Sequence, residues 1–339
     1  MGSKTLLKFV ASYVSKRQFS STSTAFKFNQ PPSANDLQRP AGIASFMRLP
    51  VQETTDGLDA CFWGLTLDSG ASNKAGTRHG PRQIRAESAQ LKFCNGLGAA
   101  PFDSLQVADV GDLPMCMYNL PQACQQIKEG TAKLIENGCK TLTMGGDHTI
   151  TYPILQAFKE KYGPVGLIHI DAHTDTGDTM MGAKIAHGTP FRRAVEEKLI
   201  DPHKTVQIGL RGTSYTPDDM QWGIDQGFTV YPATECWHKS LVPVMEDVRK
   251  LMGDMPVYVS FDIDALDPSF CPGTGTLEIG GLTSIQGLEI VRGCKGLNVV
   301  GGDVVEVSPP YDFQGQTAYT AANLLFEMLC ILPGVQYKK

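Results

Sequence analysis

VGLIHIDAHTD, residues 165–175, begins as a run of apolar residues of strand length and then places Asp171, His173 and Asp175 at alternate positions. In an extended segment alternate side chains point the same way, so these three side chains are expected to converge. Two carboxylates and an imidazole crowded at a strand end are costly without a cation between them. The stretch therefore predicts a buried strand with a metal site at its carboxyl end.

Strand-like and helix-like segments alternate along the rest of the chain. The sequence predicts strands at 59–65, 105–110, 139–144, 165–170, 205–210, 228–231, 257–263 and 297–307. It predicts helices at 80–93, 120–137, 189–197, 241–252, 283–292 and 317–332, and a further helix capped by Asp147. Short strands rich in Val and Ile between helices predict an α/β fold with a single, mainly parallel sheet and helices on both faces. Ligands of such folds bind beyond the carboxyl ends of the strands.

The first 35 residues differ from the rest. They contain no Asp or Glu, a Ser/Thr cluster at 20–24, an apolar helical face, and five basic residues: Lys4, Lys8, Lys16, Arg17 and Lys27. This composition is typical of a mitochondrial transit peptide, with an ordinary disordered tail as the alternative. We therefore expect residues 1–35 to target the protein to the mitochondrial matrix and residues 36–339 to form one catalytic domain.

Bulk properties exclude some classes of function. The net charge of -5 argues against a nucleic-acid partner, and no apolar run approaches the roughly 20 residues of a membrane span. The nine cysteines are scattered without a Cys-x-x-Cys pair, which favours reduced core cysteines.

Two more motifs place ligand-type side chains after predicted strands. GGDHT (145–149) carries His148, and its glycines let the backbone approach a crowded centre. SFDID (260–264) ends another strand with Asp262 and Asp264. Taken singly, these are a capping or packing histidine and a helix-capping pair of aspartates. Together with residues 171–175 they follow apolar runs at three predicted strand ends, which favours one shared metal site.

Charge balance predicts two cations in this site. The aspartates bring four negative charges and the two histidines are neutral ligands, so one divalent cation would leave a net charge of about -2 in a desolvated pocket. Oxygen-rich ligation without thiolates favours Mn²⁺, although nickel, cobalt and zinc remain open. A metal pair can lower the pKa of a bridging water enough for hydroxide to exist near neutral pH.

These motifs, with SFDIDALDPSFCPGTGTLEIGG at 260–281, resemble the ureohydrolase family of arginases and agmatinases over roughly residues 40–333. Within the family the chain is most similar to mitochondrial agmatinase-like and guanidino acid hydrolase proteins of animals. The resemblance implies a three-layer α/β/α fold, two Mn²⁺ ions per subunit and a trimeric or hexameric homo-oligomer. It implies six metal ligands: His148 and Asp175 on one ion, His173 and Asp264 on the other, and Asp171 and Asp262 bridging.

The resemblance also implies three catalytic residues. Glu306, near the end of the last predicted strand, pairs with the substrate guanidinium, and a half-buried Glu there needs a cationic partner in any case. His187, which on its own could be an ordinary loop histidine, gives a proton to the leaving amine. Asp175 orients the attacking hydroxide while it binds metal. Asp303 and Asp147 are expected to support or cap the site.

The expected reaction is hydrolysis of a guanidino group to urea and an amine. Thr176–Asp178 stands where arginases carry an Asn, which argues against arginine and for agmatine, giving putrescine and urea. Asp178 is either a partner for the distal ammonium or a solvated loop residue. The alternative is a guanidino acid hydrolase acting on 4-guanidinobutanoate or 3-guanidinopropanoate, for which Lys184, Arg192 and Arg211 are candidate carboxylate partners. Remoter alternatives are an arginase, a single-zinc deacetylase and a non-catalytic polyamine- or partner-binding protein.

Overall fold

Eight strands form one sheet, and every pair of neighbouring strands is parallel. The computed structural model describes residues 28–338, so residues 1–27 of the predicted transit peptide lie outside the described residues. The strand order is β2-β1-β3-β8-β7-β4-β5-β6. In chain order the strands are β1 (Ala60–Gly64), β2 (Val107–Asp112), β3 (Lys140–Met144), β4 (Val165–Ile170), β5 (Ile200–Ile208), β6 (Thr229–Tyr231), β7 (Pro256–Asp262) and β8 (Asn298–Val305). The predicted parallel sheet is confirmed.

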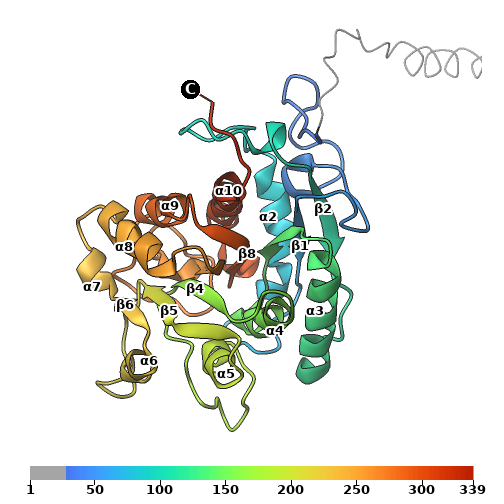
Figure 1. The fold of residues 1–339 in the computed structure, drawn as a ribbon. Helices are drawn as coiled ribbons and strands as arrows, with labels where there is room; N and C mark the ends of the chain where they lie inside the picture. Colours follow the sequence, from blue (N-terminus) through green and yellow to red (C-terminus); the bar gives the residue numbers. More distant parts are fainter. Residues whose placement is uncertain (1–27, 339) are drawn as a thin grey trace, which may run out of the picture.

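Helices cover both faces of the sheet and complete the three layers (Figure 1). One face packs against α2, α8, α9 and α10, and the other against α3, α4 and α5. The helices are α2 (Gly80–Ser88), α3 (Leu120–Ile135), α4 (Thr151–Tyr162), α5 (Pro190–Glu196), α6 (Gln221–Gln226), α7 (Ala233–Cys236), α8 (Val242–Met252), α9 (Ser284–Gly293) and α10 (Gln316–Ile331). Within the described residues, none of these helices has the length and apolar character needed to cross a membrane.

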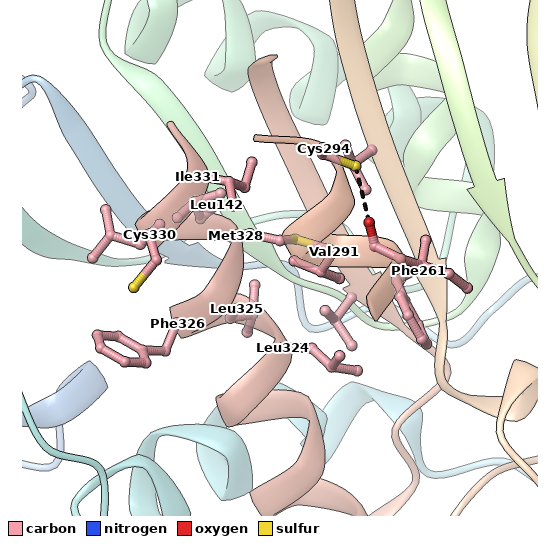
Figure 2. Close-up of a cluster of buried hydrophobic side chains, with 14 of the residues drawn as sticks. Leu142, Phe261, Val291, Cys294, Leu324, Leu325, Phe326, Met328, Cys330 and Ile331 are labelled. Atoms are coloured by element: carbon pink, nitrogen blue, oxygen red, sulfur yellow. Dashed lines mark hydrogen bonds between the residues drawn. The ribbon is translucent and has the colours of Figure 1, made fainter. Parts of the chain in front are cut away.

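The core beneath α10 explains why this helix is apolar on nearly all sides. Leu324, Leu325 and Met328 pack together with Phe261 of β7 and Val291 of α9 (Figure 2). A helix enclosed by a sheet and two other helices has little surface left for a polar face.

All nine cysteines lie within residues 28–338, and all are free thiols there, seven of them buried. The expected core cysteines are thus found for these seven.

Two of the predicted boundaries that differ from the structure have clear local causes. Helix α2 ends at Ser88 instead of continuing to residue 93, because Ser88 Oγ donates to the carbonyl of Arg85 and accepts from the amide of Met47. Such side-chain bonds compete with the helical ladder. Strand β8 stops at Val305, so Glu306 lies beyond the strand with a positive φ of 62°.

Candidate metal centre and active site

Four neighbouring strands, β3, β8, β7 and β4, carry the polar motifs at their carboxyl ends. The pairing of Ile170 with Phe261 makes Asp171 and Asp262 leave adjacent strands side by side. Glu306 follows β8, on the other side of β7. Because all these strands are parallel, motifs far apart in the sequence meet at one edge of the sheet.

The GGDHT motif brings His148 into this edge through two local features. A Cβ on Gly146 would lie 1.8 Å from the carbonyl oxygen of Leu67, so only glycine permits this close backbone approach. Asp147 then caps the short helix η4 (His148–Ile150) by accepting from the amide of Thr149 at 2.9 Å. The predicted capping role of Asp147 is confirmed, and His148 is fully buried.

The side chains of residues 171–175 converge, but not because the segment is extended. Strand β4 ends at Ile170, and the amide of His173 donates to Asp171 Oδ1 at 2.6 Å, which turns the chain. Asp175 then adopts a positive φ of 50°. A tight turn, rather than the alternation of an extended strand, therefore brings the two carboxylates together.

The first group of donor atoms surrounds His148 Nδ1. The nearest carboxylate oxygens belong to Asp171 (Oδ2, 3.1 Å), Asp175 (Oδ2, 3.0 Å) and Asp262 (Oδ2, 3.2 Å). All four residues are buried. Four donors from the ends of β3, β4 and β7 therefore face one another across a distance that suits a bound ion.

A second group lies around His173 Nδ1, with Asp264 Oδ2 at 3.1 Å and Asp171 Oδ1 at 3.4 Å. Asp264 is held by Thr276 Oγ1, which donates to its Oδ2 at 3.0 Å. Asp171 gives one oxygen to each group, so the two groups share a carboxylate. The structure thus brings all six predicted ligands together in two adjoining sets.

Hydrogen bonds fix which ring nitrogen of His148 carries a proton. Asp303 accepts from Tyr258, Thr151 and Ser260, the last at 2.7 Å. Because the single proton of Ser260 goes to Asp303, Ser260 Oγ accepts from His148 Nε2 at 2.9 Å. In the neutral ring this leaves a lone pair on the buried Nδ1, which has no hydrogen-bond partner in residues 28–338. A lone pair that faces carboxylate oxygens matches a set of metal ligands, so these residues fit a metal centre.

Burial and neighbouring charges shift the pKa values in this cluster. Burial, with the charges of Asp264 and Asp171, raises the pKa of Asp262 well above its usual range. Burial alone would lower the pKa of His148, but the surrounding carboxylates raise it well above its usual range. Both shifts express the same demand for positive charge, which divalent cations would meet.

A buried histidine that the sequence analysis did not single out lies beside the first group. His169 Nε2 donates to Asp171 Oδ2 at 2.7 Å, and its Nδ1 accepts from Gln207 Nε2 at 2.9 Å. The Gln207 amide also donates to the carbonyl of Thr174 at 2.8 Å. The spacing of His169 and Asp171 on one strand face was a usable signal. Gln207 lies on β5 and could be found only from the strand order.

His187 and Glu306 lie next to the first group and contact each other. His187 Nδ1 is 3.2 Å from Glu306 Oε1, which also accepts from the amide of His148 at 2.9 Å. Burial lowers the pKa of His187, but Glu306 and the neighbouring carboxylates of Asp175 and Asp147 outweigh burial and raise it to about 9. The contact with Glu306 therefore helps His187 to keep its proton.

A cavity of about 410 Å³ opens onto these groups. Its wall includes His173, Asp175, His187, Asp262 and Glu278, together with the hydroxyl residues Ser72, Thr213, Ser214, Tyr215 and Thr276. The size suits a small linear substrate.

Of the four residues proposed to contact the distal end of a substrate, three form other contacts and the fourth is exposed. Asp178 pairs with Arg193 at 2.9 Å. Arg192 pairs with Glu196 and lies over the ring of Trp222. Arg211 donates to backbone carbonyls that include those of residues 264, 265 and 278. Lys184 is exposed and does not line the described cavity wall. Asp178 therefore matches its second interpretation, a solvated loop residue, and none of the three basic residues lines the described cavity wall.

An all-parallel sheet between two layers of helices, with two donor sets of imidazoles and carboxylates at its carboxyl edge, fits the class of hydrolases that use metal ions. The sequence model of the arginase family matches residues 58–330, and the chain belongs to this family of ureohydrolases.

Named relatives and solved structures agree with this membership. The chain is 61% identical to the chicken protein "Agmatinase, mitochondrial", over 92% of either chain. It is 59% identical to the human protein "Guanidino acid hydrolase, mitochondrial", over 91% of this chain and 88% of the relative. The solved structure of proclavaminate amidino hydrolase from Streptomyces clavuligerus superimposes with a TM-score of 0.82 at 37% identity, covering 86% of this chain and 99% of that one.

Proposed function

We propose that this protein is a two-metal ureohydrolase that cleaves the guanidino group of a small linear guanidine to urea and an amine. The observation that carries the proposal is the pair of donor sets that share Asp171 beside a small cavity. We assign the ligands as follows: His148 and Asp175 to one ion, His173 and Asp264 to the other, and Asp171 and Asp262 to both.

Mn²⁺ is the metal that we propose for this centre. The donors are carboxylate oxygens and imidazole nitrogens without a thiolate, which suits a harder ion. When bound, two such ions supply a hydroxide nucleophile near neutral pH and neutralise developing charge. Metal content and urea release after reconstitution with manganese, cobalt, nickel or zinc test this choice.

The protein's own side chains then orient the substrate and move the proton. Glu306 is 2% exposed and contacts His187 of the cavity wall, and its carboxylate suits the guanidinium of the substrate. Asp175, 3.0 Å from His148 Nδ1 and on the cavity wall, lies where it can orient the attacking oxygen. His187 holds a proton near neutral pH because of Glu306, and an amine leaves only when it is protonated.

Replacing His187 with Ala is expected to lower kcat by about a hundredfold, the lower end of the usual contribution of a general acid. Metal content should stay at the wild-type value, because His187 contacts Glu306 and Ser72 and none of the six proposed ligands. Urea release and elemental analysis measure the two effects. The exposed His203→Ala variant is the control. Loss of metal from the His187 variant would instead make this residue a ligand.

Agmatine is the substrate that the cavity supports best. Among the described residues of its wall no Lys or Arg occurs, whereas Glu278 contributes a carboxylate. Glu278 Oε1 lies 4.0 Å from His173 Nε2, and the side chain is 25% exposed. A carboxylate in this wall attracts a cationic chain end such as the agmatine ammonium and repels the anionic end of a guanidino acid.

Glu278→Gln is expected to raise KM for agmatine about three- to fivefold. This change corresponds to the loss of a partly exposed ion pair, which contributes roughly 1 kcal/mol. The same change should leave kcat nearly unaltered. It should not weaken the binding of 4-guanidinobutanoate, because the Glu278 charge that is lost repels the carboxylate of that substrate. Initial rates of urea release with both compounds check this. An unchanged KM for agmatine would remove Glu278 from substrate recognition.

A guanidino acid is the second candidate, because a relative 59% identical to this chain is named a guanidino acid hydrolase. The hydroxyls of Thr213 and Ser214 on the cavity wall would be the neutral partners of a carboxylate. A urea-release assay with manganese on agmatine, 4-guanidinobutanoate, 3-guanidinopropanoate and arginine separates the candidates. A higher kcat/KM for either acid than for agmatine would reverse our substrate assignment.

We further propose a mitochondrial matrix location and a trimeric or hexameric assembly. The chicken and human relatives are named mitochondrial, and residues 1–35 are basic and free of Asp and Glu. Import of a fusion to residues 1–35 and light scattering of the purified protein test the two statements.

A further inference from the structure

The loop between β1 and α2 contacts both the backbone and the imidazole of His187. The carbonyl of Gly70 accepts from the amide of His187 at 3.1 Å. Ser72 Oγ is 2.7 Å from His187 Nε2, and the amide of Ser72 donates to the same nitrogen at 3.2 Å. Ser72 and His187 both line the substrate cavity. The serine hydroxyl therefore lies at the ring nitrogen opposite the one that contacts Glu306.

The position of this loop is fixed by two contacts with other parts of the protein and by one contact within the loop. The amide of Gly70 donates to Asp147 Oδ2 at 2.8 Å. The amide of Gly76 donates to Asp68 Oδ2 at 3.0 Å, which closes the loop on itself. Asn73 Nδ2 donates to the carbonyl of Gly275 at 3.0 Å. Ser72 is thus presented to His187 by a built structure, although its side chain is solvent-accessible through the cavity.

Only the hydroxyl of Ser72 can contact His187 Nε2 in both protonation states of the ring. The amide is a donor alone, so it bonds to Nε2 only when this nitrogen carries a lone pair and Nδ1–H points to Glu306. A hydroxyl donates to the neutral ring and accepts from the charged ring. With a pKa of about 9, His187 is charged at neutral pH, so a ring that donates this proton and then regains it passes through both states in each turnover.

We propose that Ser72 Oγ relays the proton from His187 Nε2 to the leaving amine, an inference that rests on the proposed ureohydrolase function. As the C–N bond breaks, the departing nitrogen takes the hydroxyl proton of Ser72. The Ser72 oxygen takes the proton of His187 Nε2 in the same step. The ring is left neutral with its proton on Nδ1 toward Glu306. The proton of the attacking hydroxyl also passes to the departing nitrogen, through Asp175, so the products are urea and the protonated amine. The next proton comes from water in the cavity.

The test compares Ser72→Ala with Ser69→Ala and Ser72→Thr. Ser72→Ala removes the hydroxyl but keeps the amide contact, and we expect kcat to fall by about ten- to a hundredfold with KM and metal content unchanged. Ser69, also exposed and in the same loop, bonds outward to the carbonyl of Met117 at 2.8 Å, so Ser69→Ala should match the wild type. Ser72→Thr retains a hydroxyl and should restore most of kcat.

Solvent isotope effects distinguish a relay from a purely structural serine. A proton inventory on kcat should be curved for the wild type, where two protons move together, and linear for Ser72→Ala. A Ser72→Ala enzyme with the kcat of Ser69→Ala overturns the relay, as does a loss explained wholly by lower metal content. If the wild type releases urea from none of the four guanidines, the proposed function and the relay fall together. Urea release with full activity in Ser72→Ala refutes the relay alone.

Discussion

Replacing Asp262 with Asn is expected to abolish urea release and to deplete metal from a chain that still folds. Asp262 Oδ2 lies 3.2 Å from His148 Nδ1, and its Oδ1 accepts from the amide of Asp264 at 2.9 Å. The amide oxygen of Asn can keep the second contact, so the end of β7 should hold its shape. The charge needed for two cations is lost, and we expect kcat to fall by at least about a thousandfold, more than the cost of altering a group that only supports a ligand.

Chelation should lower the Tm of the wild type and leave the Tm of this variant unchanged. Asp262 is 3% exposed, and burial with the charges of Asp264 and Asp171 raises its pKa well above the usual range. Without cations these carboxylates repel one another, and Asn removes one of the charges. The chelated Asp262→Asn protein should therefore have a Tm at least as high as that of the chelated wild type, whereas manganese should raise only the Tm of the wild type.

Asp109→Asn is the matched control for this experiment. Asp109 is also a buried aspartate, but it pairs with Arg85 at 2.7 Å, away from the metal centre. Its replacement should lower Tm with and without chelator and leave metal content unchanged. Near-wild-type activity or a full metal content in Asp262→Asn would show that Asp262 does not bridge the two ions.

The strand–helix alternation and the ligand motifs could be predicted from the sequence because each is encoded locally. Apolar runs such as VGLIHI determine the strands, and parallel pairing then carries Asp171 and Asp262 to the same edge. The glycines of GGDHT correctly predicted a close approach of the backbone, since the contact of Gly146 with the carbonyl of Leu67 leaves no room for a side chain. Local chemistry and fold agree at these positions.

The missed features depend on contacts between segments distant in the sequence. Ser72 lies 115 residues from His187, in a loop whose Gly, Ser and Asn content predicts only irregular structure. Gln207 meets His169 because β5 neighbours β4, an order that the sequence did not specify. The predictions for the distal end of the substrate depend on such contacts too. The sequence around Arg211 could not reveal that its guanidinium already donates to backbone carbonyls.

Replacing Glu306 with Gln should lower kcat/KM by roughly a hundred- to several-thousandfold while metal content stays normal. Glu306 is buried just beyond β8, with the positive φ of 62° that is typical of strained functional positions. Its Oε1 accepts from the amide of His148 at 2.9 Å, a bond that the amide oxygen of Gln can keep. The substrate guanidinium would then enter a buried position without its counter-charge, at a cost of about 3–5 kcal/mol.

The Glu306 variant should also change the pH dependence of the reaction. Among the charges around His187, Glu306 is the foremost one that raises its pKa to about 9. Removing that charge lowers the pKa of His187, so the ring loses its proton at a lower pH and the alkaline limb of kcat should move toward neutral. Profiles of kcat against pH for the wild type, Glu306→Gln and Glu278→Gln measure this shift. Glu278→Gln is the control, because Glu278 lines the same cavity as His187 but does not contact it in the described structure. An unshifted alkaline limb would show that Glu306 does not set the pKa of His187. Loss of metal would show that Glu306 supports His148 instead of binding the substrate.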